Sequence, residues 1–226
     1  MNKSSIPRLS TKTEPFKFVE SLEGKTKKNF EMVISRYDED VSWCKNYMDF
    51  VTIYNKGDDI NYDYIKLENK GHLADTILRH IITNYDNLAD VTFFTHGSFN
   101  YRSDQVIKEQ GRCHRKFQEF ITTDQDTLVC IPRYDLPGKN DTFYDYHETV
   151  ADVYHKIFGE TYSRNFPWAC GKWISVSREK IRKTPVSTYG KMLAFVLNNH
   201  DNKEPSQHIY RTRGIYIERF ILKCFL

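Results

Sequence analysis

The sequence predicts a single α/β domain with a mostly parallel central sheet flanked by helices. Short apolar segments alternate with amphipathic ones through the amino-terminal half, which is typical of a parallel sheet with crossover helices. Apolar residues make up 39% and charged residues 28% of the 226-residue chain, as in globular domains. Residues 1–29 are polar and basic and are expected to form a lead-in arm, which leaves 30–226 as the domain.

The amino-terminal half supplies the strands and helices on which this prediction depends. Leu73 and Ile77 recur at helical spacing, whereas 30–35 is a short apolar run typical of a buried strand. Strands are expected at 30–35, 51–54, 64–67 and 91–94, with one helix that begins near 40 or 42 and another at about 73–83. Open sheets of this kind bind ligands beyond the carboxyl ends of their strands. The polar segments 36–40, 55–59 and 95–100 are therefore expected to form a site.

The carboxyl-terminal half predicts further elements that pack onto the same sheet. Its amphipathic segments have helical periodicity, and its apolar runs have the length of strands. Helices are expected at 103–120, 147–158, 186–199 and 214–222, and strands at 128–131 and 173–177.

Composition and missing motifs exclude several classes of protein. A net charge of +3 is too small to indicate a nucleic-acid binder. No window of about 18 apolar residues predicts a membrane span, and no apolar stretch follows the first charges as in a secretory signal. The five scattered cysteines contain no C-x-x-C, which favours a reducing, cytoplasmic location. The phosphate-loop, dinucleotide-binding and α/β-hydrolase motifs are absent as well.

Two pairs of aspartates have the spacing D-x-D, which can hold the divalent metal of a nucleotide-diphosphate sugar. They are Asp38 with Asp40, and Asp124 with Asp126. The first pair could instead begin a helix as a cap with first-turn acids. The second could be an exposed turn. Asp38 is a candidate for binding a nucleotide donor because it follows the first predicted strand.

The chain resembles a family of fungal and large-virus proteins catalogued as a domain of unknown function. The run Val33-Ile-Ser-Arg-Tyr-Asp-Glu-Asp-Val-Ser-Trp43 is similar to the opening of that family, which reads approximately A-R-Y-x-E-D-x-S-W. Further matches occur in the same order over about 32–226. They are Tyr54-Asn-Lys-Gly57, Asn69-x-Gly71, Thr76-x-Leu78-Arg-His-Ile81, Asn84-Tyr-Asp-Asn-Leu88, Phe94 with Gly97, Trp168-x-x-Gly171, Val176-Ser-Arg-Glu179 and Glu218-Arg-x-Phe220.

The layout of this family resembles that of GT-A glycosyltransferases, including virus-encoded enzymes that decorate capsid glycans. The resemblance implies a Rossmann-like sheet, a UDP-sugar donor, a glycan acceptor and host cytoplasm if the protein is viral. Thr95-His-Gly97 occupies the position of the metal-binding D-x-D, so dependence on Mn²⁺ or Mg²⁺ stays open, with His96 as a candidate ligand. His208 comes late, where some GT-A enzymes supply a metal-binding histidine. His72-Leu73 replaces the Arg-Glu usual in the family.

Five residues of the expected donor site each have a structural alternative. Arg36 and Lys56 could each bind a diphosphate. Arg36 could instead pair with the acids beside it, and Lys56 could instead lie in a solvated turn. Tyr37 could stack on a base or pack in the core. Gly71 would allow a positive φ or the close approach of a ligand. Arg79 could point at a phosphate from its helix or have no such role.

The expected acceptor site combines aromatic rings with a carboxylate. Trp168 and Trp173 could stack on pyranose rings or fill the core. Glu218 is a candidate general base for the acceptor hydroxyl, with Asp40 as the alternative.

Two other functions remain open at this point. A non-catalytic module that binds a nucleotide or glycan would explain the missing acid pair. A metal-dependent hydrolase would use His72, His80 and His96, although no H-E-x-x-H motif supports it and His80 has the pattern of an interior histidine.

Overall fold

The computed structural model describes residues 17–97, 107–109, 113–115, 117–144, 146–198 and 205–226. Its strands are β1 (Phe30–Arg36), β2 (Val51–Asn55), β3 (Ile65–Lys66), β4 (Val91–His96), β5 (Ile107–Glu109), β6 (Cys113–Arg115), β7 (Leu128–Arg133) and β8 (Trp168–Ser177). Its α-helices are α1 (His72–Asn84), α2 (Val150–Phe158), α3 (Arg178–Arg182), α4 (Val186–Leu197) and α5 (Gln207–Phe220). Short 3-10 helices are η1 (Glu20–Leu22), η2 (Ser42–Phe50), η3 (Phe117–Phe120) and η5 (Ile221–Phe225).

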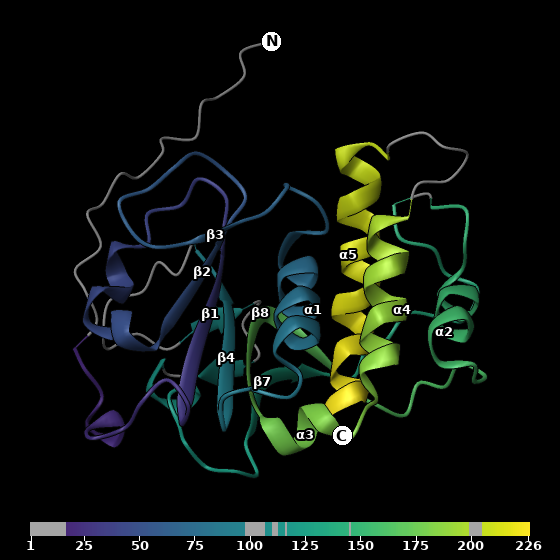
Figure 1. The fold of residues 1–226 in the computed structure, drawn as a ribbon. Helices are drawn as coiled ribbons and strands as arrows, with labels where there is room; N and C mark the ends of the chain where they lie inside the picture. The colour runs from purple at the N-terminus through teal and green to yellow at the C-terminus, as the bar shows by residue number, and fades with distance from the viewer. Residues whose placement is uncertain (1–16, 98–106, 110–112, 116, 145, 199–204) are drawn as a thin grey trace.

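Six strands form one sheet in the order β3-β2-β1-β4-β8-β7 (Figure 1). β5 and β6 form a separate pair. The neighbours among β1, β2, β3 and β4 are parallel, whereas β8 is antiparallel to both β4 and β7. The expected α/β class and mostly parallel sheet are therefore confirmed. The carboxyl ends of β1, β2, β3, β4 and β7 lie along one edge with the start of β8, here called the carboxyl edge.

The chain leaves β1 toward β2 on one side and later returns to β4 on the other. This places a topological switch point between β1 and β4, where open α/β sheets bind their ligands. All seven residues of β1 are buried, because a central parallel strand is covered on both faces. The switch point therefore lies beside a fully buried central strand.

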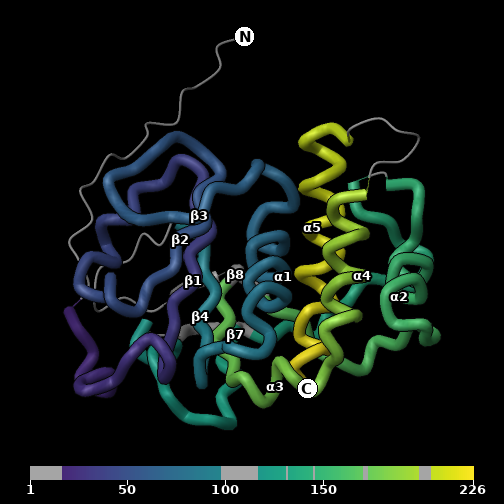
Figure 2. Tube along the Cα trace, viewed as in Figure 1, coloured from purple at the N-terminus to yellow at the C-terminus, as the bar shows by residue number. Residues whose placement is uncertain are grey.

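Helices cover the sheet in a layered arrangement. Helix α1 packs against β1 and β4, and its other side contacts α4 and α5 (Figures 1 and 2). Helix α2 also contacts α4. The C-terminus lies beside α3, where Lys183 Nζ donates to the Leu226 carbonyl at 2.8 Å.

Two glycines allow the start of α1 to contact α4 and α5 closely. Gly71 precedes α1 with φ +61°, and a Cβ there would lie 2.3 Å from Val196 Cγ1 of α4. A Cβ on Gly214 of α5 would lie 2.8 Å from the Gly71 carbonyl oxygen. Gly71 thus has the positive φ expected from the sequence, and the partner that approaches it closely is the protein itself.

The described part of the expected lead-in arm packs onto the domain. Leu22 is 1% exposed and belongs to the core. Tyr47 Oη donates to the Lys17 carbonyl at 2.6 Å, and the Phe18 ring stacks on Tyr47. The segment that precedes β1 is therefore part of the folded unit from residue 17 onward.

The predicted helix over 103–120 is wrong for the residues that the structure describes. Ile107–Glu109 pairs antiparallel with Cys113–Arg115, and only Phe117–Phe120 is helical, as a 3-10 turn. Charged residues favoured a helix locally, but Gly111 interrupts that pattern and strand pairing outweighs local preference. The last helix also begins earlier than expected, at Gln207.

Candidate functional site

The loops that follow β1 and β4 meet at the switch point. Ser35 is paired with His96 in the sheet, and the Gly97 amide donates to the Ser35 carbonyl at 2.8 Å. A Cβ on Gly97 would lie 3.0 Å from the Glu39 side chain, so the two loops are in direct contact. We call residues 37–40 with His96 and Gly97 the switch-point site.

The loop after β1 presents three polar side chains. Tyr37 is 50% exposed, and its amide donates to Glu39 Oε2 at 2.6 Å. Asp38 and Asp40 are also exposed. Asp40 accepts bonds of 2.8 Å from both the amide and the hydroxyl of Ser42, where η2 begins. The expected helix-starting role of Asp40 and its exposure at the site therefore coexist.

Arg36 holds this loop from inside the protein. The residue is 8% exposed, and its guanidinium donates to the carbonyls of Glu39 and Tyr37 at 2.9 Å. It also donates to Asn55 Oδ1 and the Asp58 carbonyl, both at 2.8 Å. Arg36 therefore ties the loops after β1 and β2 together, and its acceptors are carbonyl and amide oxygens rather than a carboxylate.

Asn55 and Gly57 complete this junction, and both lie in the segment 55–59 that the sequence predicts to be part of the site, although neither was singled out by its own role. Asn55 is fully buried at the end of β2, and its Nδ2 donates to the Asp58 carbonyl at 2.8 Å. A Cβ on Gly57 would lie 1.7 Å from the Tyr37 carbonyl oxygen, so only glycine fits. The signal in the sequence was a polar amide at the end of an apolar strand, followed two residues later by glycine.

Lys56 and Arg79 share one buried carboxylate. Lys56 Nζ lies 3.0 Å from Asp75 Oδ2 and donates to the carbonyls of Lys70 and His72. Burial lowers the pKa of Lys56, and the Asp75 carboxylate opposes this shift. Arg79 Nε lies 2.7 Å from Asp75 Oδ1. Because all three ammonium hydrogens of Lys56 have acceptors, it anchors the start of α1 instead of a phosphate.

His96 ends β4 and is partly exposed beside Trp173. Their ring centroids lie 5.9 Å apart at an interplanar angle of 26°. Trp173 itself is 3% exposed, so its ring packs against His96 from the interior of the protein. The structure thus brings His96 next to the loop of Tyr37 and places Trp173 beneath it.

Trp168 is also packed, at the start of β8. Its Nε1 donates to Asp135 Oδ1 at 3.2 Å, and the Arg219 guanidinium lies 3.3 Å from the ring centroid. Arg133 forms a two-pronged pair with Asp135, which lowers the pKa of that carboxyl to about 2. Burial of both tryptophans leaves neither as a platform for a pyranose. The neighbouring exposed ring is Tyr134.

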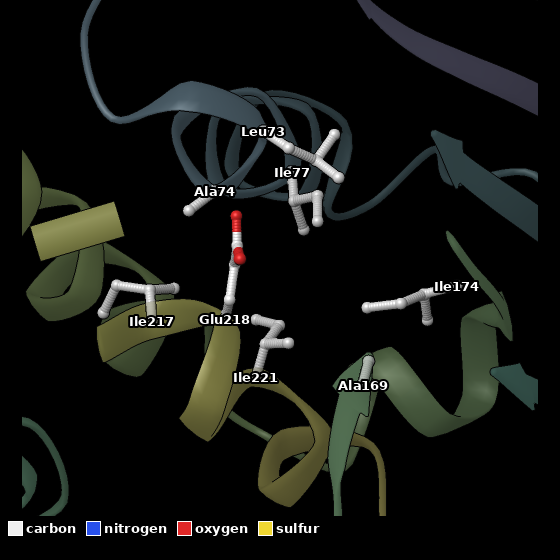
Figure 3. A pocket seen from close by; sticks show the side chains of 8 residues that line it. All are labelled: Leu73, Ala74, Ile77, Ala169, Ile174, Ile217, Glu218 and Ile221. Atoms are coloured by element: carbon white, nitrogen blue, oxygen red, sulfur yellow. The ribbon is translucent and has the colours of Figure 1, made fainter. Parts of the chain in front are cut away.

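Glu218 is not among the residues that the structure brings together in the switch-point site. It lines a small apolar cavity between α1, α5 and β8, and its carboxylate points toward Ala74 of α1 (Figure 3). His208 is exposed near the start of α5 and contacts the Tyr144 ring. Of the two candidate bases, Asp40 is therefore the one at the switch-point site.

The remaining candidate residues do not gather into a metal centre. Asp124 and Asp126 form an exposed turn before β7, where Lys180 lies 2.9 Å from Asp126, at the edge opposite the site. His80 is buried between Tyr54 and Glu31, and His72 is exposed at the start of α1. Within the described ranges, no three His, Cys, Asp or Glu side chains are placed to hold a metal ion. None of the described helices has the length and hydropathy of a membrane span.

These features define a mixed α/β domain with exposed polar side chains at its topological switch point. The chain belongs to the family described as "Protein of unknown function (DUF3431)", whose family model matches residues 32–213. The matched region contains the whole central sheet except the first residues of β1. No curated protein and no solved structure matches the chain.

Proposed function

We propose that the protein is a glycosyltransferase that moves a sugar from a UDP-sugar donor to a glycan acceptor, with the donor at the switch-point site. One observation carries this proposal. An exposed aromatic ring, Tyr37, and a partly exposed imidazole, His96, extend from neighbouring strand ends at the switch point. A ring there can stack on a nucleobase, and the switch point of an open sheet is where such ligands bind.

The proposed reaction uses residues of the loop after β1. An acceptor hydroxyl attacks the anomeric carbon, the bond from that carbon to the diphosphate oxygen breaks, and UDP leaves with the bonding electrons. Asp40 takes the hydroxyl proton as general base because its carboxylate is exposed at the site. Arg36 and Asn55 keep the loop in place from below, which limits reorganisation during the reaction.

A divalent cation would complete the donor site. Asp38 and His96 offer an oxygen and a nitrogen donor on the two adjoining loops, a combination that suits Mn²⁺ with further oxygens from the diphosphate. When bound, such an ion would offset the charge that builds on the departing UDP.

The buried free cysteines Cys44, Cys130 and Cys224 are consistent with the cytoplasmic location that we propose.

Calorimetric titration with UDP, with and without Mn²⁺, tests the donor site. Tyr37→Ala should weaken UDP binding about 5- to 150-fold, because base stacking contributes about 1–3 kcal/mol. Tyr134→Ala is the matched control, since that tyrosine is 76% exposed and directly follows β7, outside the switch-point site. Absence of UDP binding, or equal losses in both variants, would refute the proposed site.

A non-catalytic module that binds nucleotide or glycan is the second candidate. The absence of an acid pair at 95–97 favours it. Incubation with a panel of UDP-sugars separates the two functions. The enzyme should release UDP, and Asp40→Asn should lower kcat more than UDP affinity. Tight UDP binding without turnover of any donor would support the module.

A further inference from the structure

A second polar pocket lies at the opposite end of the strands from the switch-point site. It has a volume of about 370 Å³ and lies between the amino ends of β1 and β2 and the last turn of α1. We call it the amino-edge pocket. Its polar lining includes Lys27, Lys28, Glu31, His80, Asn84 and Asn87.

The topology explains why this pocket is open. Helix α1 covers β1 and β4, but the described connection from β2 to β3 contains no helix. The face of β2 beside α1 is therefore left without a covering helix. Thr52 and Tyr54 lie on this face together with Glu31, and all three line the pocket.

The floor of the pocket is a buried carboxylate held in a fixed network. Glu31 Oε1 accepts from Thr52 Oγ1 at 2.5 Å and lies 3.5 Å from Lys27 Nζ. His80 Nε2 lies 3.3 Å from Glu31 Oε2 without the alignment of a hydrogen bond. His80, Thr52 and Lys27 together outweigh desolvation and lower the pKa of Glu31. The carboxylate is therefore ionised and held in place near neutral pH.

The floor also offers a hydroxyl. Tyr54 Oη lies 3.3 Å from His80 Nδ1. Burial, reinforced by the charge of Glu31, raises the pKa of Tyr54 to about 12, so the phenol keeps its proton. Glu31 and Tyr54 thus present a fixed acceptor and a fixed hydroxyl side by side.

The rim carries cationic and amide donors. Lys27 Nζ donates to the Val51 carbonyl at 2.8 Å. In the part of the chain that the structure describes, neither the ammonium group of Lys28 nor the side-chain amide of Asn87 forms a hydrogen bond or an ion pair. Among Lys27, Lys28 and Glu31, the lining therefore carries two positive charges and one negative charge.

The geometry points to a binding site for a small hydroxylated organic anion, of the sugar-phosphate class, in the amino-edge pocket. The anionic group would contact Lys28 and Asn87 at the rim, where charge-assisted bonds are strongest. Its hydroxyl groups would reach Glu31 and Tyr54 on the floor. The pocket volume lies within the range of small-molecule sites. Because Glu31 and Arg36 are near opposite ends of β1, this site is separate from the switch-point site.

Amide NMR of the whole chain, titrated with glucose 6-phosphate, inorganic phosphate and glucose, tests this inference. Glucose 6-phosphate should shift the amides of Lys28, Glu31 and Asn87, and it should bind more tightly than inorganic phosphate. Glucose should cause no shift. Lys28→Ala and Asn87→Ala should each weaken binding about tenfold, while Lys45→Ala, an exposed lysine on η2, should not.

The following outcomes would overturn the inference. They are no shifts with glucose 6-phosphate, shifts scattered over the surface, and equal losses in Lys28→Ala and Lys45→Ala. Equal affinity for inorganic phosphate would reject the role of the floor and with it the proposed ligand class. The result is independent of the glycosyltransferase proposal, since Lys28→Ala should keep UDP binding and Tyr37→Ala should keep glucose 6-phosphate binding.

Discussion

Lys56 is a charged residue that stabilises the fold, although its position after a strand suggests that it binds a ligand. It directly follows β2 at the carboxyl edge, which made it a candidate for binding phosphate. The structure instead gives its ammonium three oxygen acceptors in a buried setting. Arg36 is committed in the same way. The exposed residues of the loop, Tyr37, Asp38 and Asp40, are the ones available to a ligand.

Replacing Lys56 by methionine should destabilise the protein by about 3–5 kcal/mol, because Asp75 would keep a buried charge with one fewer partner. Urea unfolding measures the change. The control is Lys66→Met, which breaks the exposed pair with Asp59 and should change stability little. A small effect of Lys56→Met would contradict the anchoring role.

Glu31→Gln should destabilise the protein by about 1–3 kcal/mol at pH 7, because the amide cannot replace the ionised partner of His80 and Lys27. The folded-state pKa of Glu31 is lowered, so its contribution is present above the ordinary glutamate value of about 4.3 and disappears as the pH falls through the lower folded value. Urea unfolding between pH 7 and pH 3 should therefore show the two proteins converging in acid. The exposed Glu23→Gln serves as control.

At the scale of elements, close helix contacts at α1 place it over the sheet. Gly71 and Gly214 let α4 and α5 approach the start of α1 more closely than any side chain would permit. The same end of α1 is held by Lys56 through the His72 carbonyl. The orientation of α1 above β1 and β4 therefore depends on backbone contacts as well as on apolar packing.

Gly71→Ala should destabilise the protein by about 1–3 kcal/mol through its positive φ, with a further loss from the clash with Val196. Adding Val196→Ala should relieve the clash but not the φ strain. Thermal unfolding of both variants separates the two contributions. Gly190→Ala in α4 has open space for its methyl group and should raise the melting temperature. A neutral Gly71→Ala would show that α1 can shift.

At the scale of the whole molecule, the sheet brings together residues that are far apart in the chain. His96 and the loop of Tyr37 adjoin only because β1 pairs with β4 in the sheet, although β2, β3 and α1 lie between these two strands in the sequence. The amino-edge pocket arises from the same strand order at the other end. One sheet therefore supports two separate polar regions.

Double-mutant cycles for UDP binding should reflect this arrangement. Tyr37→Ala and His96→Ala should show a coupling above about 0.5 kcal/mol, because their loops touch and would contact the same ligand. Tyr37→Ala and Tyr134→Ala should be additive within about 0.5 kcal/mol. Calorimetry of the single and double variants provides the comparison. Additivity of the first pair would argue against a shared site.

The local pattern of the sequence predicted the elements of the amino-terminal half well. β1, β2, β4 and α1 were expected close to their observed bounds, because the strands are short, β-branched or aromatic apolar runs and α1 has apolar residues at helical spacing. The carboxyl-terminal half was harder. The strands of 107–115 and the antiparallel direction of β8 depend on pairing between distant segments, and local periodicity carries no information on strand direction.

By itself the sequence determined an α/β domain with polar residues after its strands, since hydrophobic periodicity is encoded locally. Only the tertiary structure decided which of those polar residues face solvent. Arg36, Lys56, Trp168 and Trp173 are buried, whereas Tyr37 and His96 keep exposed surface. The physical reason is that exposure and hydrogen-bond partners depend on neighbours supplied by distant parts of the chain, such as Asn55 for Arg36 and Asp75 for Lys56.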